Sequence, residues 1–204
     1  MASSRSALSA RQAEPGEYLA VARLLAEVFF DDPMYAWLVP STKRRKSAIT
    51  NLFNTACDVL STADRAAVWT TDAFVGGAIW TPPGQPNPSI AMALRVASDM
   101  IFGLRWGMFR QMEVESSLTP INERHWYLNT IGVVASERGR GIGSALLAPI
   151  ISRCDRDRLP IYLNTNTDDN VRFYRGRGFE IIREIDLDHG RMHLYEMRRP
   201  PTVK

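Results

Sequence analysis

Helical spacings of apolar residues alternate along this chain with short runs of β-branched and aromatic residues. Residues 17–30 carry apolar side chains on one helical face, whereas residues 126–134 form an apolar run that is typical of a buried strand. The same patterns predict helices at residues 17–30, 34–38, 43–60, 89–112, 142–154 and 169–177, and strands at residues 8–13, 66–70, 74–80, 126–134, 160–165, 179–187 and 191–198. Mixed strands and helices without an internal repeat predict one α/β domain.

The extent of this domain follows from the pattern and the composition. We expect residues 1–6 to be a flexible tail and residues 7–200 to form the domain. With 45% hydrophobic and 23% charged residues among 204, the chain can bury a sizeable core. Its N-terminus has no apolar leader, and no apolar stretch has the length of a membrane span. We therefore expect a soluble cytoplasmic protein with no membrane partner.

Charge and metal-ligating residues exclude further classes of function. The net charge is +3, and no stripe of Lys and Arg alternates with aromatic residues, so we expect no nucleic-acid partner. The densest basic cluster, residues 43–46, is interpreted as a solvated helix start. The two cysteines, Cys57 and Cys154, imply no disulfide framework, and the three histidines are scattered. We therefore expect no metal site.

A glycine-rich loop at residues 138–144 lies between the predicted strand at 126–134 and the helix that follows. Glycines let backbone N–H groups crowd together, and a helix start adds unpaired donors, so this arrangement favours an anion. Its Arg-x-x-Gly-x-Gly spacing differs from a dinucleotide fingerprint and from a triphosphate loop. The segment therefore indicates a phosphate or diphosphate cradle, with a tight turn carrying solvated arginines as the alternative.

A second segment, residues 170–179, contains Asn170, Phe173, Tyr174, Gly178 and Phe179. Together with the glycine loop, in this order and separation, it resembles the GNAT acetyltransferase superfamily. Members of that superfamily use acetyl-coenzyme A. The fold that this resemblance implies is a single α/β domain with a mixed central sheet, splayed between its fourth and fifth strands and flanked by helices.

The resemblance extends over most of the chain. Residues 30–33, 37–40, 112–113 and 125–128 look like the branch that contains puromycin N-acetyltransferase. One position departs from the pattern: many relatives carry a glutamate in the fifth strand where this chain has Asn164. The resemblance therefore carries over no role for that glutamate in recognising the acceptor.

The resemblance implies a site for acetyl-CoA as co-substrate. We expect the diphosphate on the loop amides, with charge from Arg138 or Arg140, and the pantetheine arm paired with the backbone of the fourth strand. The predicted binding residues are Ile131, Val133, Val134, Arg138, Gly139, Arg140, Gly141, Ile142, Gly143, Ser144 and Asn170. Asn170 has a second interpretation as a helix N-cap.

The chemistry of acetyl transfer suggests a general acid. An amine that attacks the thioester expels a thiolate, and a tyrosine hydroxyl has a pKa near that of a thiol. We therefore predict Tyr174 as the general acid, with a core aromatic beside Phe173 as the alternative. The general base stays open, because water or a carboxylate can take the proton. The carboxylate candidates are Asp32, Glu113, Glu115, Glu123 and Glu196.

The acceptor is the least determined part of the reaction. Candidate acceptor contacts are Asp32 and the aromatics Tyr35, Trp37, Trp80, Trp126 and Tyr127. We expect an N-acetyltransferase that acts on the amine of a small molecule, such as an antibiotic or a toxic metabolite, by direct attack on the thioester. The alternatives are a protein or peptide N-acetyltransferase and a non-catalytic acyl-CoA-binding module. The oligomeric state is expected to be monomer or homodimer.

Overall fold

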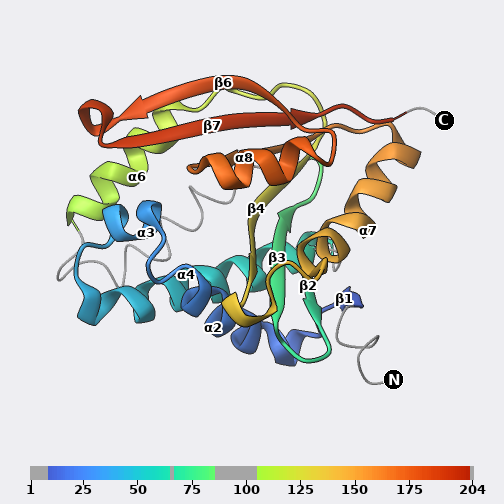
Figure 1. The fold of residues 1–204 in the computed structure, drawn as a ribbon, viewed down its shortest axis with the longest axis horizontal. Coiled ribbons are helices and arrows are strands. Elements are labelled where there is room, and N and C mark those ends of the chain that lie inside the picture. The colour runs from blue at the N-terminus through green and yellow to red at the C-terminus, as the bar shows by residue number, and fades with distance from the viewer. Residues whose placement is uncertain (1–8, 65–66, 86–104, 203–204) are drawn as a thin grey trace.

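The computed structural model describes residues 9–64, 67–85 and 105–202, and these ranges form a mixed sheet with helices on both faces (Figure 1). The strands are β1 (Ala10–Gln12), β2 (Val68–Thr71), β3 (Gly76–Thr81), β4 (Trp126–Val133), β5 (Ile161–Thr165), β6 (Glu180–Leu187) and β7 (Met192–Arg199). The α-helices are α2 (Tyr18–Val28), α3 (Pro33–Leu38), α4 (Thr42–Ala63), α6 (Arg105–Ser117), α7 (Ile142–Asp157) and α8 (Asp168–Arg175). Short 3-10 helices are η1 (Pro15–Glu17), η3 (Ala135–Glu137) and η4 (Asp188–Gly190).

The predicted elements agree with these bounds to within a few residues, and the mixed α/β class is confirmed. The long helix predicted at residues 89–112 is the main difference. Its first part lies outside the described residues, as does the predicted tail at residues 1–6, and the described helix α6 runs on to Ser117. Among the helices of the described residues, none combines the length and hydrophobicity that a membrane-spanning segment needs.

The sheet has the strand order β1-β2-β3-β4-β5-β7-β6. Neighbouring strands are antiparallel except β4 and β5, which are parallel and are joined by the crossover helix α7. Their parallel pairing ends where Leu128 faces Leu163, although β4 continues to Val133. The two strands therefore separate, and the splay between the fourth and fifth strands is present as predicted.

A bulge in β4 sets which side chains face the splay. Ile79 of β3 lies opposite Thr130 and Trp80 lies opposite Leu128, so Asn129 has no partner in β3. The extra residue reverses the alternation of side chains. Leu128 packs in the core beneath α7, and after the bulge it is Ile131, rather than Thr130, that packs against that core.

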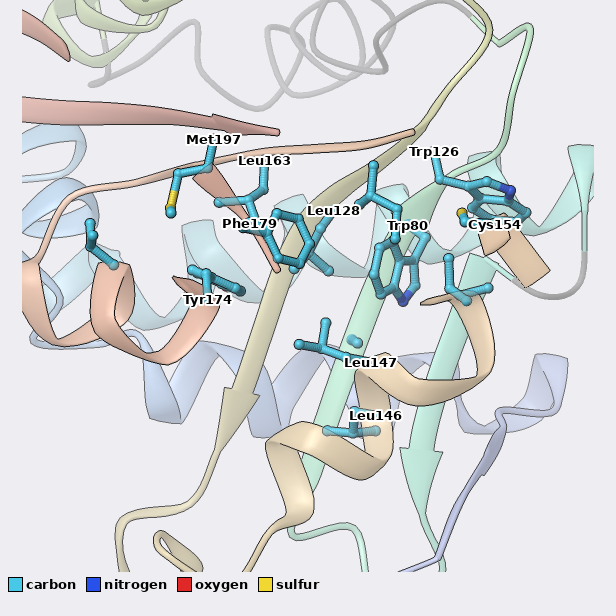
Figure 2. Close-up of a cluster of buried hydrophobic side chains, with 14 of the residues drawn as sticks. Trp80, Trp126, Leu128, Leu146, Leu147, Cys154, Leu163, Tyr174, Phe179 and Met197 are labelled. Atoms are coloured by element: carbon cyan, nitrogen blue, oxygen red, sulfur yellow. The ribbon is translucent and has the colours of Figure 1, made fainter. Parts of the chain in front are cut away.

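Two hydrophobic cores lie on opposite faces of the sheet. Helix α7 covers one face, where Leu146 and Leu147 pack with Trp80, Trp126 and their neighbours (Figure 2). Helices α2 and α4 cover the other face (Figure 1). The close approach of α2 requires glycine at position 132, because a Cβ there would lie 2.9 Å from Val28 Cγ1. The last turn of α2 is therefore held close against the middle of the sheet.

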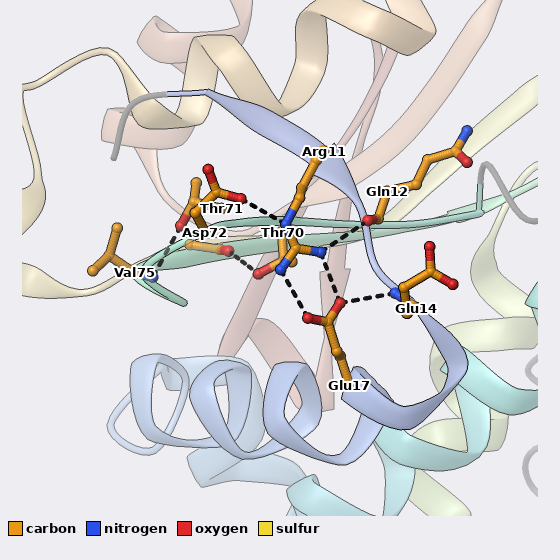
Figure 3. Close-up of polar contacts among 9 residues, drawn as sticks. Arg11, Gln12, Glu14, Glu17, Thr70, Thr71, Asp72 and Val75 are labelled. Atoms are coloured by element: carbon orange, nitrogen blue, oxygen red, sulfur yellow. Dashed lines mark hydrogen bonds and ion pairs between the residues drawn. The ribbon is translucent and has the colours of Figure 1, made fainter. Parts of the chain in front are cut away.

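An ion-pair network fixes the edge of the sheet at β1 (Figure 3). The Arg11 guanidinium lies 2.7 Å from Glu17 Oε2 and 2.7 Å from Asp72 Oδ1. Glu17 also accepts the Glu14 N–H at 2.8 Å. The Arg11 hydrogen bonds lower the pKa of Glu17 to about 2. This cluster joins β1 to the start of α2 and to the turn between β2 and β3.

The basic cluster at residues 43–46 was interpreted as solvated, and the structure corrects this for Arg45. Its side chain is 7% exposed and donates to the carbonyl oxygens of Val39 at 2.9 Å, Phe30 at 3.0 Å and Pro40 at 3.2 Å. A cation that satisfies free carbonyls near helix ends fixes the chain there. Arg45 thus holds the segments that follow α2 and α3.

Substitution Arg45→Met is expected to lower the free energy of unfolding by about 2 kcal/mol or more, because three carbonyls lose a charged donor. Urea denaturation followed by circular dichroism measures this change. The matched control is Lys43→Met, which removes an exposed cation from the same helix and is expected to cost under about 0.5 kcal/mol. Equal losses for the two variants would contradict the structural role of Arg45.

Candidate active site

A cleft with a volume of about 970 Å³ opens at the splay between β4 and β5. Its walls come from the C-terminal halves of both strands, the start of α7, helix α8 and the junction between α2 and α3. Residues that are distant in the sequence therefore meet here. The cleft is large enough for a small-molecule site of ordinary size.

The backbone of β4 presents to this cleft hydrogen-bonding groups that do not pair with β5. The Val134 N–H donates to the Val75 carbonyl at 2.9 Å, so it points toward β3. Because backbone groups alternate along a strand, those of Ile131 and Val133 point the other way, toward β5. No β5 residue pairs with them. The Ile131 groups and the Val133 N–H can pair with an amide-rich ligand. Val134, whose backbone was also predicted to bind, uses its N–H within the sheet and does not line the cleft.

The glycine loop forms the start of α7. Gly139 and Gly141 have φ values of +77° and +85°, a conformation that side chains rarely adopt, and a Cβ at either would meet open space. The first intrahelical bond runs from the Ala145 N–H to the Gly141 carbonyl at 3.0 Å. The preceding amides, including those of Ile142, Gly143 and Ser144, have no intrahelical acceptor. Apart from Arg140, residues 138–144 all line the cleft, and together they suit an anion.

The two loop arginines differ in position. Arg138 lines the cleft, and its Nε donates to the Val133 carbonyl at 3.3 Å. Arg140 instead forms an ion pair with Glu137 and does not line the cleft. Arg138 therefore stays a predicted co-substrate contact, whereas Arg140 lies away from the cleft, contrary to the prediction.

Helix α8 presents Asn170 to the cleft. The alternative interpretation of Asn170 as an N-cap is wrong, because the cap is Thr167, whose Oγ1 accepts the Asn170 N–H at 3.3 Å. The Asn170 side chain is therefore not required for capping. Its contact with pantetheine stays a prediction.

Tyr174 lies one turn further along α8 and also lines the cleft. Its ring is 7% exposed and packs at 5.2 Å from Phe173 and 5.5 Å from Phe179, measured between ring centroids. Within the described part of the chain, its hydroxyl has no hydrogen-bond partner. Burial raises the pKa of Tyr174, and the Arg177 guanidinium partly offsets this. The hydroxyl therefore carries its proton at neutral pH, as a general acid must.

Asp32 faces the cleft from the junction between α2 and α3. Its Oδ1 accepts the Met34 N–H at 2.9 Å, which caps α3, and the Asn166 Nδ2 at 3.2 Å. Burial raises the pKa of Asp32, and these hydrogen bonds only partly oppose the shift. No cationic side chain of the described residues pairs with this carboxylate. Asp32 thus combines a raised pKa with an uncompensated charge, as expected of a general base.

The other carboxylates that were candidates for the base do not line the cleft. Glu123 is bound by Tyr162 and Arg198 at the far end of β5. Glu113 accepts the Asp188 N–H at 2.8 Å near the hairpin between β6 and β7. Asp32 is therefore the carboxylate of that set that the structure places at the site.

Three of the aromatic acceptor predictions are wrong. Trp80 and Trp126 are both 0% exposed and pack edge to face in the core beneath α7, 6.5 Å apart (Figure 2). Trp37 also lies away from the cleft, where its Nε1 donates to Asp188 Oδ2 at 2.9 Å. Tyr35 and Tyr127 do line the cleft, so these two remain candidate acceptor contacts.

Asn164, which departs from the pattern of relatives, faces the cleft beside a buried carboxylate. Its partner in β7 is Glu196, which is 5% exposed. Glu196 accepts the N–H and the hydroxyl of Thr119, both at 2.7 Å. The Glu196 carboxylate therefore lies on the strand next to the position where many relatives carry a glutamate. Its two oxygens are already hydrogen-bonded to Thr119.

Asn166 and Arg177 are among the cleft residues that were not predicted from the sequence, and both make polar contacts across the site. Asn166 joins the end of β5 to Asp32 across 134 sequence positions, for which no local pattern exists. Arg177 follows α8, and its guanidinium contacts Ser144 Oγ at the start of α7. The sequence analysis placed Arg177 at the end of the helix predicted over residues 169–177 and gave it no role.

The cleft suits an acyl donor with a phosphorylated, amide-rich arm, and comparisons with known proteins agree with such a donor. Residues 103–179 match the model of the acetyltransferase (GNAT) family. The chain is 28% identical over 215 residues to an uncharacterized N-acetyltransferase of Schizosaccharomyces pombe, covering 97% of this chain and 85% of that protein.

Solved structures show the same fold. One is described as histone acetyltransferase HPA2 and related acetyltransferase from Corynebacterium glutamicum. It has a TM-score of 0.68 and 24% identity, covering 96% of this chain and 97% of that one. Arylalkylamine N-acetyltransferase 2 from Aedes aegypti has a TM-score of 0.65 and 13% identity, covering 95% and 98%. Residues 103–179 thus match a GNAT acetyltransferase domain, and the chain is an N-acetyltransferase with acetyl-CoA as co-substrate.

Proposed function

We propose that the enzyme acetylates the amine of a small molecule that is cationic in solution. The observation that carries this proposal is Asp32, a half-buried carboxylate in the cleft without a cationic partner among the described residues. Burying an unpaired charge is costly, and an ammonium group supplies the missing partner. The remaining neighbours at this end include Phe29, Met34 and Tyr35, which suit an apolar arm on that amine.

Different residues of the chain bind acetyl-CoA and act on the amine. Acetyl-CoA supplies an activated acetyl thioester. Its diphosphate suits the amides at the start of α7 with Arg138, and its pantetheine arm suits the backbone of Ile131 and Val133. Asp32 takes one proton from the ammonium group, so that the free amine can attack the thioester carbonyl. As the C–S bond breaks, the Tyr174 hydroxyl gives its proton to the departing thiolate, and the second proton lost by the nitrogen restores that hydroxyl.

The fold alone does not choose between small and protein acceptors, since similar structures include both a named histone acetyltransferase and an arylalkylamine N-acetyltransferase. A thiol-release assay with acetyl-CoA makes the choice. The panel contains aryl- and alkylamines, aminonucleosides, aminoglycosides and polyamines, set against peptides with lysine or a free N-terminus. We expect turnover with primary amines on an apolar or aromatic arm.

Two outcomes of the panel would overturn this proposal. Activity on peptides alone would establish a protein N-acetyltransferase. Tight CoA binding without thiol release from any amine would indicate a non-catalytic acyl-CoA-binding module. The same assay run at increasing ionic strength is a further check, because an ammonium held by Asp32 loses affinity as salt screens the pair.

A further inference from the structure

Arg177 lies over the first turn of α7, although it belongs to the turn that follows α8. Its terminal nitrogens donate to Ser144 Oγ and to the Phe173 carbonyl. The guanidinium carbon stands 3.6 Å from the centroid of the Phe173 ring. That ring abuts Gly143, where a Cβ would lie 3.1 Å from Phe173 Cζ. The cation is thus stacked in a defined place beside the anion cradle and lines the cleft.

The charge of Arg177 is uncompensated in the described part of the chain. No carboxylate there forms an ion pair with it, and its buried Nε–H has no partner. A guanidinium carries five N–H groups, and only two are used. Each terminal nitrogen therefore keeps one N–H group for a ligand. Burial lowers the pKa of Arg177, which shows that the surroundings disfavour its charge.

Two neighbouring arginines differ from Arg177 in having a carboxylate partner. Arg140 pairs with Glu137, and Arg172, on the same helix as Tyr174, pairs with Asp169. Arg138 donates to a carbonyl. A cation that is half-buried, stacked and unpaired at a helix start, with free donors, fits an anion from the solvent.

We propose that Arg177 binds the diphosphate of the co-substrate and selects acetyl-CoA over acyl thioesters that lack phosphate. The inference rests on the donor half of the proposed function. The diphosphate is chosen over the 3′-phosphate because Arg177 contacts Ser144 of the cradle itself. The planar fork of the guanidinium suits two phosphate oxygens at once.

Equilibrium binding tests this proposal without relying on turnover. Isothermal titration calorimetry with CoA and dephospho-CoA, and ligand-observed NMR with pantetheine, give the dissociation constants for wild type and Arg177→Met. We expect CoA and dephospho-CoA to bind about 10- to 100-fold more weakly to the variant, and pantetheine to bind equally to both proteins. Arg177→Lys, which keeps the charge, should recover part of the loss.

The outcomes separate the alternatives. A loss for CoA that disappears with dephospho-CoA would overturn the diphosphate assignment in favour of the 3′-phosphate. Equal losses for CoA and pantetheine, or no loss at all, would leave Arg177 with a structural role only. Arg172→Met, on the exposed side of α8, is the matched control and should bind CoA as wild type does. Wild type that binds no CoA would contradict the proposed function itself.

Discussion

Replacing Tyr174 with phenylalanine is expected to lower kcat by about 10²-fold or more and to leave the dissociation constant for CoA almost unchanged. The ring is held between Phe173 and Phe179, and phenylalanine keeps these contacts. The substitution therefore removes only the hydroxyl, which has no partner among the described residues. Steady-state kinetics with the preferred amine and calorimetry with CoA measure the two quantities.

The matched control for this prediction is Tyr162→Phe. Tyr162 is a tyrosine of β5 that lies outside the cleft. Its hydroxyl is hydrogen-bonded to Glu123 and Arg198. We expect kcat to change less than about threefold in the control. A Tyr174→Phe variant that retains kcat within the same range would exclude the hydroxyl as the proton donor and leave Tyr174 as a core aromatic.

The pH dependence gives a second measurement on the same residue. A general acid works only while protonated, so kcat should fall on the alkaline side as the hydroxyl ionises. Because burial raises the pKa of Tyr174, this fall is expected above the ordinary tyrosine range, and it should be missing in Tyr174→Phe. A wild-type alkaline limb near pH 8 would belong to another group.

Much of the fold is predictable because the strongest patterns are local. The apolar face of α2, the buried run of β4 and the glycine loop before α7 each specify an element within one short window. The bulge at Asn129 is not predictable in this way. It depends on how β3 and β4 settle against the helices on the two faces of the sheet.

The residues of the candidate site likewise fall into those that local sequence patterns reveal and those that depend on tertiary packing. The anion cradle and Tyr174 lie in two continuous motifs, so the sequence shows them. Trp80 and Trp126 were misplaced because an apolar aromatic has the same pattern in a core as at a cleft, and only packing separates the two. Arg177 was missed because a cation in a short turn gives no signal until its neighbours are known.

The second large effect is expected for Asp32→Asn, which should lower kcat/KM for the amine by about 10²-fold at neutral pH. Asparagine is an N-cap as favourable as aspartate, so it can still accept the Met34 N–H and preserve α3. What it loses is the ability to take a proton and to pair with an ammonium group. Steady-state kinetics over a range of amine concentrations measure the loss.

The acidic limb of the pH profile of kcat/KM shows whether Asp32 is the general base. Wild-type kcat/KM should rise with pH as Asp32 ionises, and burial places this rise above the ordinary aspartate range. In Asp32→Asn the limb should vanish, leaving only the ionisation of the amine itself. The control is Glu123→Gln, at the far end of β5, which should keep the limb. A limb that survives in Asp32→Asn would assign the proton to water or to another carboxylate.

Stability supplies an independent check on Asp32, with a definite sign. Its pKa is raised on folding, so the folded state holds this proton more tightly than the unfolded state does. The stability that this provides is present at low pH and is lost as the pH rises through the folded-state pKa. Asp32→Asn removes the cost of the buried carboxylate, so at neutral pH its Tm should equal or exceed that of wild type while its activity falls. A Tm that drops together with activity would mean that Asp32 acts through the fold and not as the base.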